Sequence, residues 1–266
     1  MRKLSIIIII CLIVSTASAQ KRSIGKEIKT DLWNGGTTII KTYARPFHWQ
    51  KKQWLQFGGV LAIAGAASFL DEPINDFWQA NQSRTLSRIS TVGDFMGQPE
   101  NNYPVMIATW ATGILVNSPK IRDTGIMIFA SVTTSGLLQT GLKELVGRAR
   151  PAADQGAYEF RPLSGGDYHS FPSGHTMLAL ATSWILAKQF EPLSLKLLFY
   201  SVPVVVGFSR VYDGAHWFSD IILGSALGIA CAEAVHRIYT DLKEDGKESR
   251  ISVLPTGRGI RLAYLF

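Results

Sequence analysis

Eight polar or small residues lie at the ends of four apolar segments in the second half of the chain. In chain order they are Lys143, Arg150, Ser173, Gly174, His175, Arg210, His216 and Asp220. Three permanent cations, two imidazoles and one carboxylate in one place would form a strongly positive pocket. Guanidinium groups donate paired N–H bonds to phosphoryl oxygens and an ammonium group adds a point charge, so phosphate is the anion that such a pocket fits.

The remaining groups in this set have the types that phosphate chemistry uses. A helix that begins near Ser173 offers free N–H groups to an anion, and Gly174 lets the backbone come close to it. His216 and Asp220 are at positions i and i+4, so on a helix the carboxylate can hold the imidazole in one tautomer. An imidazole held in this way can act as nucleophile or base, and His175 is left to protonate a departing oxygen.

Each residue taken alone also has a purely structural explanation. Lys143 and Arg150 can extend from a helix end to the membrane surface, His175 can cap a loop, and His216 with Asp220 can form a surface pair of little energetic consequence. The convergence of all of them at fixed spacings favours the site. The other histidines, His48, His169 and His236, join no such pattern.

Metal-dependent hydrolysis is the competing chemistry. It needs three or more His, Cys or carboxylate ligands without a crowd of cations beside them. Here only Asp220 and two histidines are available, opposed by three positive side chains. We therefore expect no metal and no other cofactor.

Six apolar segments position these residues, and together they predict an all-α membrane bundle. They cover residues 54–70, 103–118, 124–142, 176–190, 195–209 and 217–235. At 1.5 Å per residue each segment is marginal to adequate for crossing a bilayer. Short loops make consecutive helices antiparallel, so the predicted site residues should gather at one end of the bundle. The alternative is a soluble helical protein with unusually apolar buried helices.

Composition excludes several classes of protein. Of 266 residues 47% are hydrophobic and 18% are charged, which rules out a disordered chain, and two cysteines, Cys11 and Cys231, exclude a disulfide framework. The net charge is +7. Because the basic residues are spread along an apolar chain, they fit a membrane better than a nucleic acid.

The ends of the chain differ from the predicted bundle domain over residues 54–240. Residues 1–19 have the basic start, apolar stretch and small-residue cleavage site of a signal peptide, with an uncleaved anchor as the alternative. Residues 20–53 form a basic arm that suits a membrane interface. In the tail, residues 241–266, two apolar stretches around a Pro-Thr-Gly turn predict a short β-like hairpin or edge strand.

The three groups of site residues resemble the signature of the type 2 phosphatidic acid phosphatase superfamily. The signature is Lys143 through Arg150-Pro151, then Pro172-Ser173-Gly174-His175, then Ser209-Arg210 through His216 to Asp220. All three parts match in order and spacing. The six apolar segments are similar to the six-helix membrane core of this family, which is also the core type of the vanadium haloperoxidases.

The resemblance implies a mechanism and a class of substrate. His216 would attack phosphorus to form a phosphohistidine with Asp220 orienting it, and His175 would protonate the leaving alcohol. The phosphate cradle would comprise Lys143, Arg150, Ser173, Gly174 and Arg210. The implied protein is an integral membrane phosphatase for a lipid phosphate, independent of metals. The alternatives are an exported soluble acid phosphatase and a vanadium-dependent haloperoxidase.

Two signals disagree on which side of the cell membrane the pocket faces. A cleaved signal peptide predicts a cytoplasmic pocket. The basic arm, two loops and the tail carry most of the lysines and arginines, so the positive-inside rule places the pocket outside the cytoplasm. We expect the outward orientation, in which members of the family commonly act.

Overall fold

The chain is mostly helical in the computed structural model, which describes residues 23–248, 251–256 and 259–264. The α-helices are α2 (Ile24–Ala44), α3 (Lys51–Ala67), α4 (Asp71–Ala80), α5 (Arg84–Gly97), α6 (Pro99–Leu115), α7 (Pro119–Val146), α8 (Gly174–Ala187), α9 (Leu193–Tyr212) and α10 (Phe218–Glu248). Short 3-10 turns are η1 (Arg45–His48), η2 (Ser68–Leu70), η3 (Pro151–Ala153) and η4 (Gly166–Tyr168). The predicted signal peptide, residues 1–19, lies outside the described residues.

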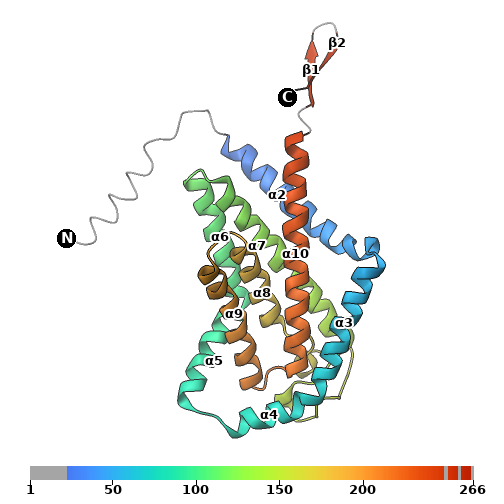
Figure 1. Ribbon diagram of the computed structural model, residues 1–266, viewed down its shortest axis with the longest axis vertical. Helices are drawn as coiled ribbons and strands as arrows, with labels where there is room; N and C mark the ends of the chain where they lie inside the picture. The colour runs from blue at the N-terminus through green and yellow to red at the C-terminus, as the bar shows by residue number, and fades with distance from the viewer. Residues whose placement is uncertain (1–22, 249–250, 257–258, 265–266) are drawn as a thin grey trace, which may run out of the picture.

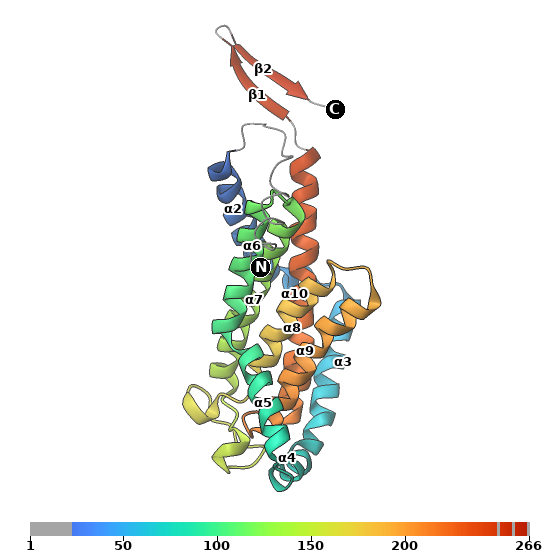
Figure 2. The ribbon, with the colours of Figure 1, turned by 90° about the vertical axis from the view of Figure 1, so that its left-hand side faces the viewer.

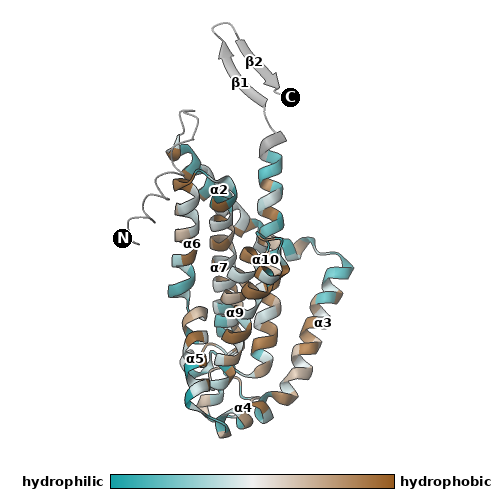
Figure 3. Cartoon of the chain, turned by 60° about the vertical axis from the view of Figure 1, so that its left-hand side comes forward, coloured by the Kyte–Doolittle hydropathy of each residue, from teal (hydrophilic) through white to brown (hydrophobic). Residues whose placement is uncertain are grey.

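Helices α7, α8 and α10 form the centre of an elongated bundle (Figures 1 and 2). Ile128 of α7, Ile185 of α8 and Val235 of α10 belong to one buried apolar cluster. Helix α3 runs beside the bundle, and most of its side chains are exposed and apolar (Figure 3). Such an exposed apolar surface is suited to contact with lipid.

Each of the six predicted apolar segments overlaps a helix, namely α3, α6, α7, α8, α9 or α10. Among the described residues, four regions are long and apolar enough to cross a membrane: Lys51–Ala80, Pro119–Val146, Leu193–Tyr212 and Phe218–Asp245. Helices α6 and α8 have 17 and 14 residues, which is short for a bilayer. A core of six membrane-crossing helices therefore stays a prediction.

The helix that carries Lys143 has clear start and stop signals. The side chain of Ser118 accepts a hydrogen bond from the backbone of Ile121, and Pro119 occupies the first turn. Gly147 ends the helix in the left-handed conformation, with φ of 57°. A Cβ at this position would lie 2.0 Å from the carbonyl oxygen of Arg161, so only glycine fits. Lys143 is thereby fixed in the last turn of α7.

Small residues allow α10 to lie close against α8. A Cβ on Gly224 would lie 2.7 Å from the backbone oxygen of Ser173, and one on Gly228 would lie 2.7 Å from that of Met177. Glycines four residues apart let two helix backbones approach closely, as in membrane proteins generally. This contact brings the start of α10 next to the start of α8.

The predicted basic arm is largely helix α2, which packs on α7 and α10. Asp31 of α2 is fully buried, and its carboxylate is 3.0 Å from the guanidinium of Arg122 and accepts a 2.9 Å hydrogen bond from the indole of Trp110. A buried carboxylate is tolerated only with such partners. The arm is therefore tied to the bundle through charged contacts.

The C-terminal boundary of the helical domain lies later than predicted. Helix α10 continues past residue 240 to Glu248. Strands β1 (Ile251–Thr256) and β2 (Gly259–Tyr264) then pair antiparallel, with Ile251 opposite Tyr264.

A buried charge cluster ties the long 147–173 connection to the bundle. The guanidinium of Arg148 lies 2.7 Å from the carboxylate of Asp71 and 2.7 Å from that of Asp220, and all three side chains are buried. Asp71 also accepts hydrogen bonds from the backbone and the hydroxyl of Ser219, at the start of α10. The cluster joins α4, the connection and α10, and the sequence analysis assigned no role to Arg148 or Asp71.

We predict that Arg148→Met strongly lowers the melting temperature of the protein in detergent micelles. The substitution leaves two buried carboxylates without their cation, and removing one partner of a buried ion pair typically costs about 3–5 kcal/mol. The matched control is Arg161→Met, because Arg161 forms an exposed pair with Glu159 and such pairs contribute little. Equal melting temperatures for the two variants would contradict the role given to Arg148.

Candidate active site

The predicted site residues meet at one end of the bundle, where α7 and α9 end and α8 and α10 begin (Figure 1). The ammonium group of Lys143 donates to the carbonyl of His169 at 2.5 Å, and the backbone N–H of Ser173 donates to the carbonyl of Asp220 at 3.1 Å. The charges of Lys143 and Arg150 both act on the imidazole of His216. The antiparallel arrangement expected from the short loops brings these groups together.

A backbone carbonyl holds the imidazole of His216. Its Nδ1 lies 2.5 Å from the carbonyl oxygen of Ser170, and the side chain is only 3% exposed. A carbonyl oxygen can only accept, so Nδ1 carries the proton and Nε2 has a free lone pair. Burial, followed by the charges of Lys143 and Arg150, lowers the pKa of His216 well below its usual value. The ring is therefore neutral at pH 7 with Nε2 unprotonated.

Asp220 does not bond directly to His216 as predicted. Its carboxylate is 3.9 Å from Nδ1, beyond hydrogen-bond distance, and the two residues do not share a helix because α10 begins at Phe218. Asp220 instead accepts hydrogen bonds from the hydroxyl of Ser170 at 2.5 Å and the backbone of Trp217 at 2.9 Å. It thus fixes the segment whose carbonyl orients His216, and its effect on the imidazole is indirect.

The three cations differ in their partners. Arg210 is paired with two carboxylates, 2.8 Å from Asp94 and 2.9 Å from Asp213. The guanidinium of Arg150 is half-buried and forms no hydrogen bond or close ion pair with the described residues. Burial lowers its pKa, and the neighbouring charge of Asp167 opposes that effect. Arg150 is therefore the cation of the site that is most available to an incoming anion.

Asp94 is a member of the site that the sequence analysis missed. Its carboxylate lies 3.4 Å from Nε2 of His175 and accepts a 2.8 Å hydrogen bond from Gln98. Burial lowers the pKa of His175 to about 4, the charge of Arg210 adds to this shift, and Asp94 opposes it. His175 is therefore neutral at pH 7 in the empty site.

The sequence feature that could have identified Asp94 is the pair of glycines beside it. A Cβ on Gly93 would lie 2.5 Å from the backbone oxygen of Val205, and one on Gly97 would lie 2.7 Å from Cβ of His175. Two glycines four residues apart indicate a close helix contact. The polar 71–102 stretch, which lies between the first two apolar segments, packs α5 against α8 and α9 and contributes Asp94.

The start of α8 lies at the expected position. The hydroxyl of Ser173 bonds to that of Thr176 at 3.0 Å, and Ser173 precedes the first turn of the helix. A Cβ on Gly174 would lie 1.8 Å from Oε1 of Gln139 on α7, which is the end of a flexible side chain. This glycine therefore leaves room for the Gln139 side chain beside the helix start, where the free N–H groups favour an anion.

Residues 124–244 match the sequence model of the PAP2 superfamily. The chain is similar to lipid A 1-phosphatase of Rhizobium etli, with 39% identity over 107 residues that cover 39% of this chain and 45% of the relative. It is 35% identical over 114 residues to phosphatidylglycerophosphatase B of Bacillus subtilis, covering 40% of this chain and 53% of the relative. The matches span about half the length of these relatives.

Solved structures show the same fold. A PAP2-type phosphatidylglycerolphosphate phosphatase from Bacillus subtilis superposes with a TM-score of 0.56 at 26% identity, covering 76% of this chain and all of that one. LpxE of Aquifex aeolicus gives a TM-score of 0.51 at 21% identity, covering 63% and 95% of the two chains. The chain is thus a multi-pass membrane protein, and the stretch that matches the PAP2 superfamily model, residues 124–244, contains all eight predicted site residues.

Proposed function

We propose that the protein is an integral membrane phosphatase that hydrolyses a lipid phosphate or diphosphate monoester through a phosphohistidine. The observation that carries the proposal is the state of His216, which is neutral, held at Nδ1 by the carbonyl of Ser170 and placed beside cations. A fixed neutral imidazole among positive charges is arranged to attack an anionic phosphorus centre. The relatives whose names describe phosphatases support the same reaction.

In the first step, Nε2 of His216 attacks phosphorus and the bond from phosphorus to the lipid oxygen breaks. Lys143, Arg150 and Arg210 stabilise the negative charge on the three phosphoryl oxygens, which is the main contribution that a protein makes to phosphoryl transfer. His175 donates its proton to the departing lipid alkoxide. The negative charge of the bound phosphate raises the pKa of His175 from its low value, so His175 takes up this proton from solvent before the step.

In the second step, a water molecule attacks the phosphohistidine. His175, now neutral, accepts a proton from the water, the bond from phosphorus to Nε2 breaks, and inorganic phosphate leaves. His216 returns to its neutral form with Nδ1 still bonded to Ser170. No step requires a metal, and we propose that turnover is metal-independent.

A mostly apolar cavity between four of the helices supports a lipid substrate. It has a volume of about 510 Å³ and is lined by apolar side chains of α4, α8, α9 and α10, among them Trp78, Val211 and Phe218. Val211 directly follows Arg210, and Phe218 lies two residues after His216. A lipid with its phosphate at the cations would have an apolar surface close by for its chains. The four candidate spans and this cavity favour a membrane enzyme over a soluble acid phosphatase or a haloperoxidase.

We predict that His216→Ala lowers phosphate release from lipid mono- and diphosphates at least about 1,000-fold in the presence of excess chelator. The variant removes the attacking nitrogen but leaves the buried cluster around Asp220 intact, so the melting temperature should change little. The matched control is His236→Ala, on α10 and outside the site, which should keep full activity. Activity of His216→Ala within a few-fold of wild type would exclude His216 as the nucleophile, and dependence on added zinc or magnesium would exclude the metal-free mechanism.

We predict that binding of an oxyanion to the empty site takes up a proton at about pH 6. His175 has a pKa of about 4 in the empty site, so it is neutral at this pH, and a bound anion raises its pKa and protonates it. Sulfate is a suitable probe because it is tetrahedral and carries no proton at this pH. Calorimetry in two buffers of different ionisation enthalpy measures the uptake. The same uptake in His175→Asn would show that another group is protonated.

We propose that the active site faces outward from the cell membrane, and two single-cysteine variants test this. Ser164→Cys places an exposed thiol in the connection near the site, and Glu191→Cys places one in the exposed loop between α8 and α9 at the other end of the bundle. In intact cells an impermeant thiol reagent should label Ser164→Cys, and Glu191→Cys should be labelled only after lysis. The reverse pattern would place the site in the cytoplasm.

A further inference from the structure

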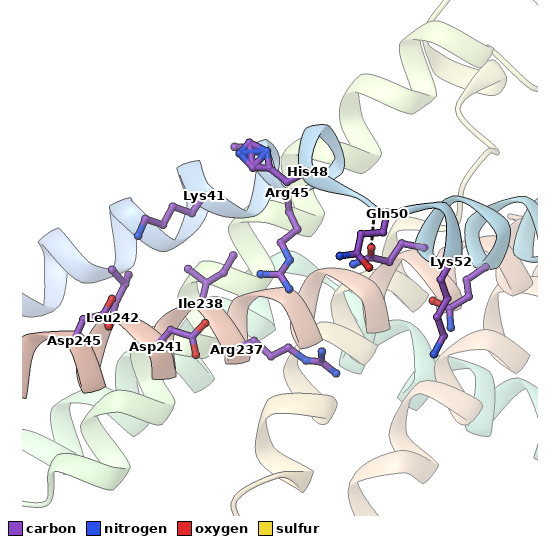
Figure 4. A pocket seen from close by; sticks show the side chains of 13 residues that line it. Lys41, Arg45, His48, Gln50, Lys52, Arg237, Ile238, Asp241, Leu242 and Asp245 are labelled. Atoms are coloured by element: carbon purple, nitrogen blue, oxygen red, sulfur yellow. Dashed lines mark hydrogen bonds between the residues drawn. The ribbon is translucent and has the colours of Figure 1, made fainter.

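A second cavity lies at the end of the bundle opposite the active site. It has a volume of about 840 Å³ and is formed by α2, η1, the start of α3 and the last part of α10 (Figure 4). This volume lies within the range of sites that bind small molecules or lipid head groups. None of the predicted catalytic or phosphate-binding residues lines it.

The cavity carries charges of both signs. Its cationic side chains are Lys41, Arg45, Lys52 and Arg237, and its carboxylates are Asp241 and Asp245. Arg237 is paired with Glu233 at 2.7 Å. The other five form no hydrogen bond or close ion pair with any described side chain. These charges are therefore free to contact a ligand that enters the cavity.

The charges are separated along the cavity. Arg237, Asp241 and Asp245 are four residues apart on α10 and so share one face of the helix, with about 6 Å of rise between successive members. Arg45 extends from the end of α2 toward α10, and Lys52 lies on the side of α3 (Figure 4). The cavity thus has a basic end near α3, and its other end, near the C-terminus of α10, carries Asp241 and Asp245 together with Lys41 of α2 (Figure 4).

The cavity also lies where two candidate spans leave the membrane at the same end of the bundle. The span Lys51–Ala80 begins there and the span Phe218–Asp245 ends there. The rings of Trp49, Trp54 and Phe57 form a cluster at the start of α3, with the centroids of the two indoles 4.9 Å apart. Tryptophan side chains are enriched at the boundary between lipid and water. The cavity is therefore at the level of lipid head groups.

We propose that this cavity binds the head group of a zwitterionic aminophospholipid. The basic end formed by Arg45, Lys52 and Arg237 contacts the phosphodiester, and Asp241 with Asp245 contacts the primary ammonium group. A purely anionic head group would bring no cation to these two carboxylates, beside which Lys41 is the cationic side chain of the cavity. A phosphodiester is not a phosphate monoester, so this lipid is a bound partner and not a substrate, and the inference does not depend on the proposed catalytic activity.

The test is lipid binding to purified, delipidated full-length protein in detergent, measured by native mass spectrometry. Phosphatidylethanolamine is expected to bind about tenfold more tightly than phosphatidylglycerol, which has the same phosphodiester without the ammonium group. Equal binding of the two lipids, or tighter binding of phosphatidylglycerol, would overturn the proposal. Glycerophosphoethanolamine has the head group without acyl chains, and binding equal to that of the lipid would overturn the assignment to a membrane lipid.

Three variants assign the contacts. The double variant Asp241→Asn with Asp245→Asn should abolish the preference for phosphatidylethanolamine. The double variant Arg45→Gln with Arg237→Gln should weaken the binding of both lipids about tenfold. The matched control is Lys29→Gln, an exposed lysine of α2 that does not line the cavity. A melting temperature close to that of wild type shows that each variant is folded. An unchanged lipid preference in the double aspartate variant, or unchanged affinity for both lipids in the double arginine variant, would contradict the proposed contacts.

Discussion

The arrangement of the active site depends on the buried contact of Arg148 with Asp71 and Asp220. Asp71 binds the start of α10 through Ser219, and Asp220 binds the hydroxyl of Ser170. The carbonyl of Ser170 in turn fixes the tautomer of His216. One guanidinium thus determines where the connection after α7 passes and how the imidazole is oriented. Because both carboxylates contact this guanidinium, each has a cationic partner without a lysine or arginine of the predicted phosphate pocket.

The antiparallel helices supply an electrostatic frame for the remaining charges. Lys143 and Arg210 occupy the last turns of α7 and α9, where the helix dipole is negative and favours cations. Helices α8 and α10 begin at the same end, where the dipole is positive and favours an anion. The fold therefore separates the groups that carry positive charge from the helix starts that attract negative charge. A phosphate between them interacts favourably with both.

The sequence could predict that the eight proposed site residues gather at one end of the bundle, because their spacing follows the helix ends. The rule that consecutive helices of a bundle run antiparallel was enough to place Lys143, His175 and Arg210 together. The sequence could not predict how His216 is held, because the bond to Ser170 depends on the path of a long irregular connection. The spacing of four residues suggested a helical pair with Asp220, but α10 begins two residues after His216. Spacing indicates a shared face only where both residues are helical.

Asp71 and Asp94 were missed for a related reason. Both lie in a stretch of low hydropathy between apolar segments, where most carboxylates face water. Their packing distinguishes them. Asp71 of α4 pairs with Arg148 of the 147–173 connection. Asp94 is flanked by Gly93 and Gly97, which let α5 lie against α8 and α9. Contacts of this kind join residues far apart in the chain, and composition does not reveal them. The pair of glycines was the one local indication of them.

The two cavities place different demands on a bound lipid. The cavity between α4, α8, α9 and α10 is lined mostly by apolar side chains, so it favours the chains of a lipid. The cavity at the other end has Lys41, Arg45 and Lys52 opposite Asp241 and Asp245 of α10, none of them paired with a described side chain. It therefore favours a head group that carries both charges, so the two cavities fit different parts of a lipid.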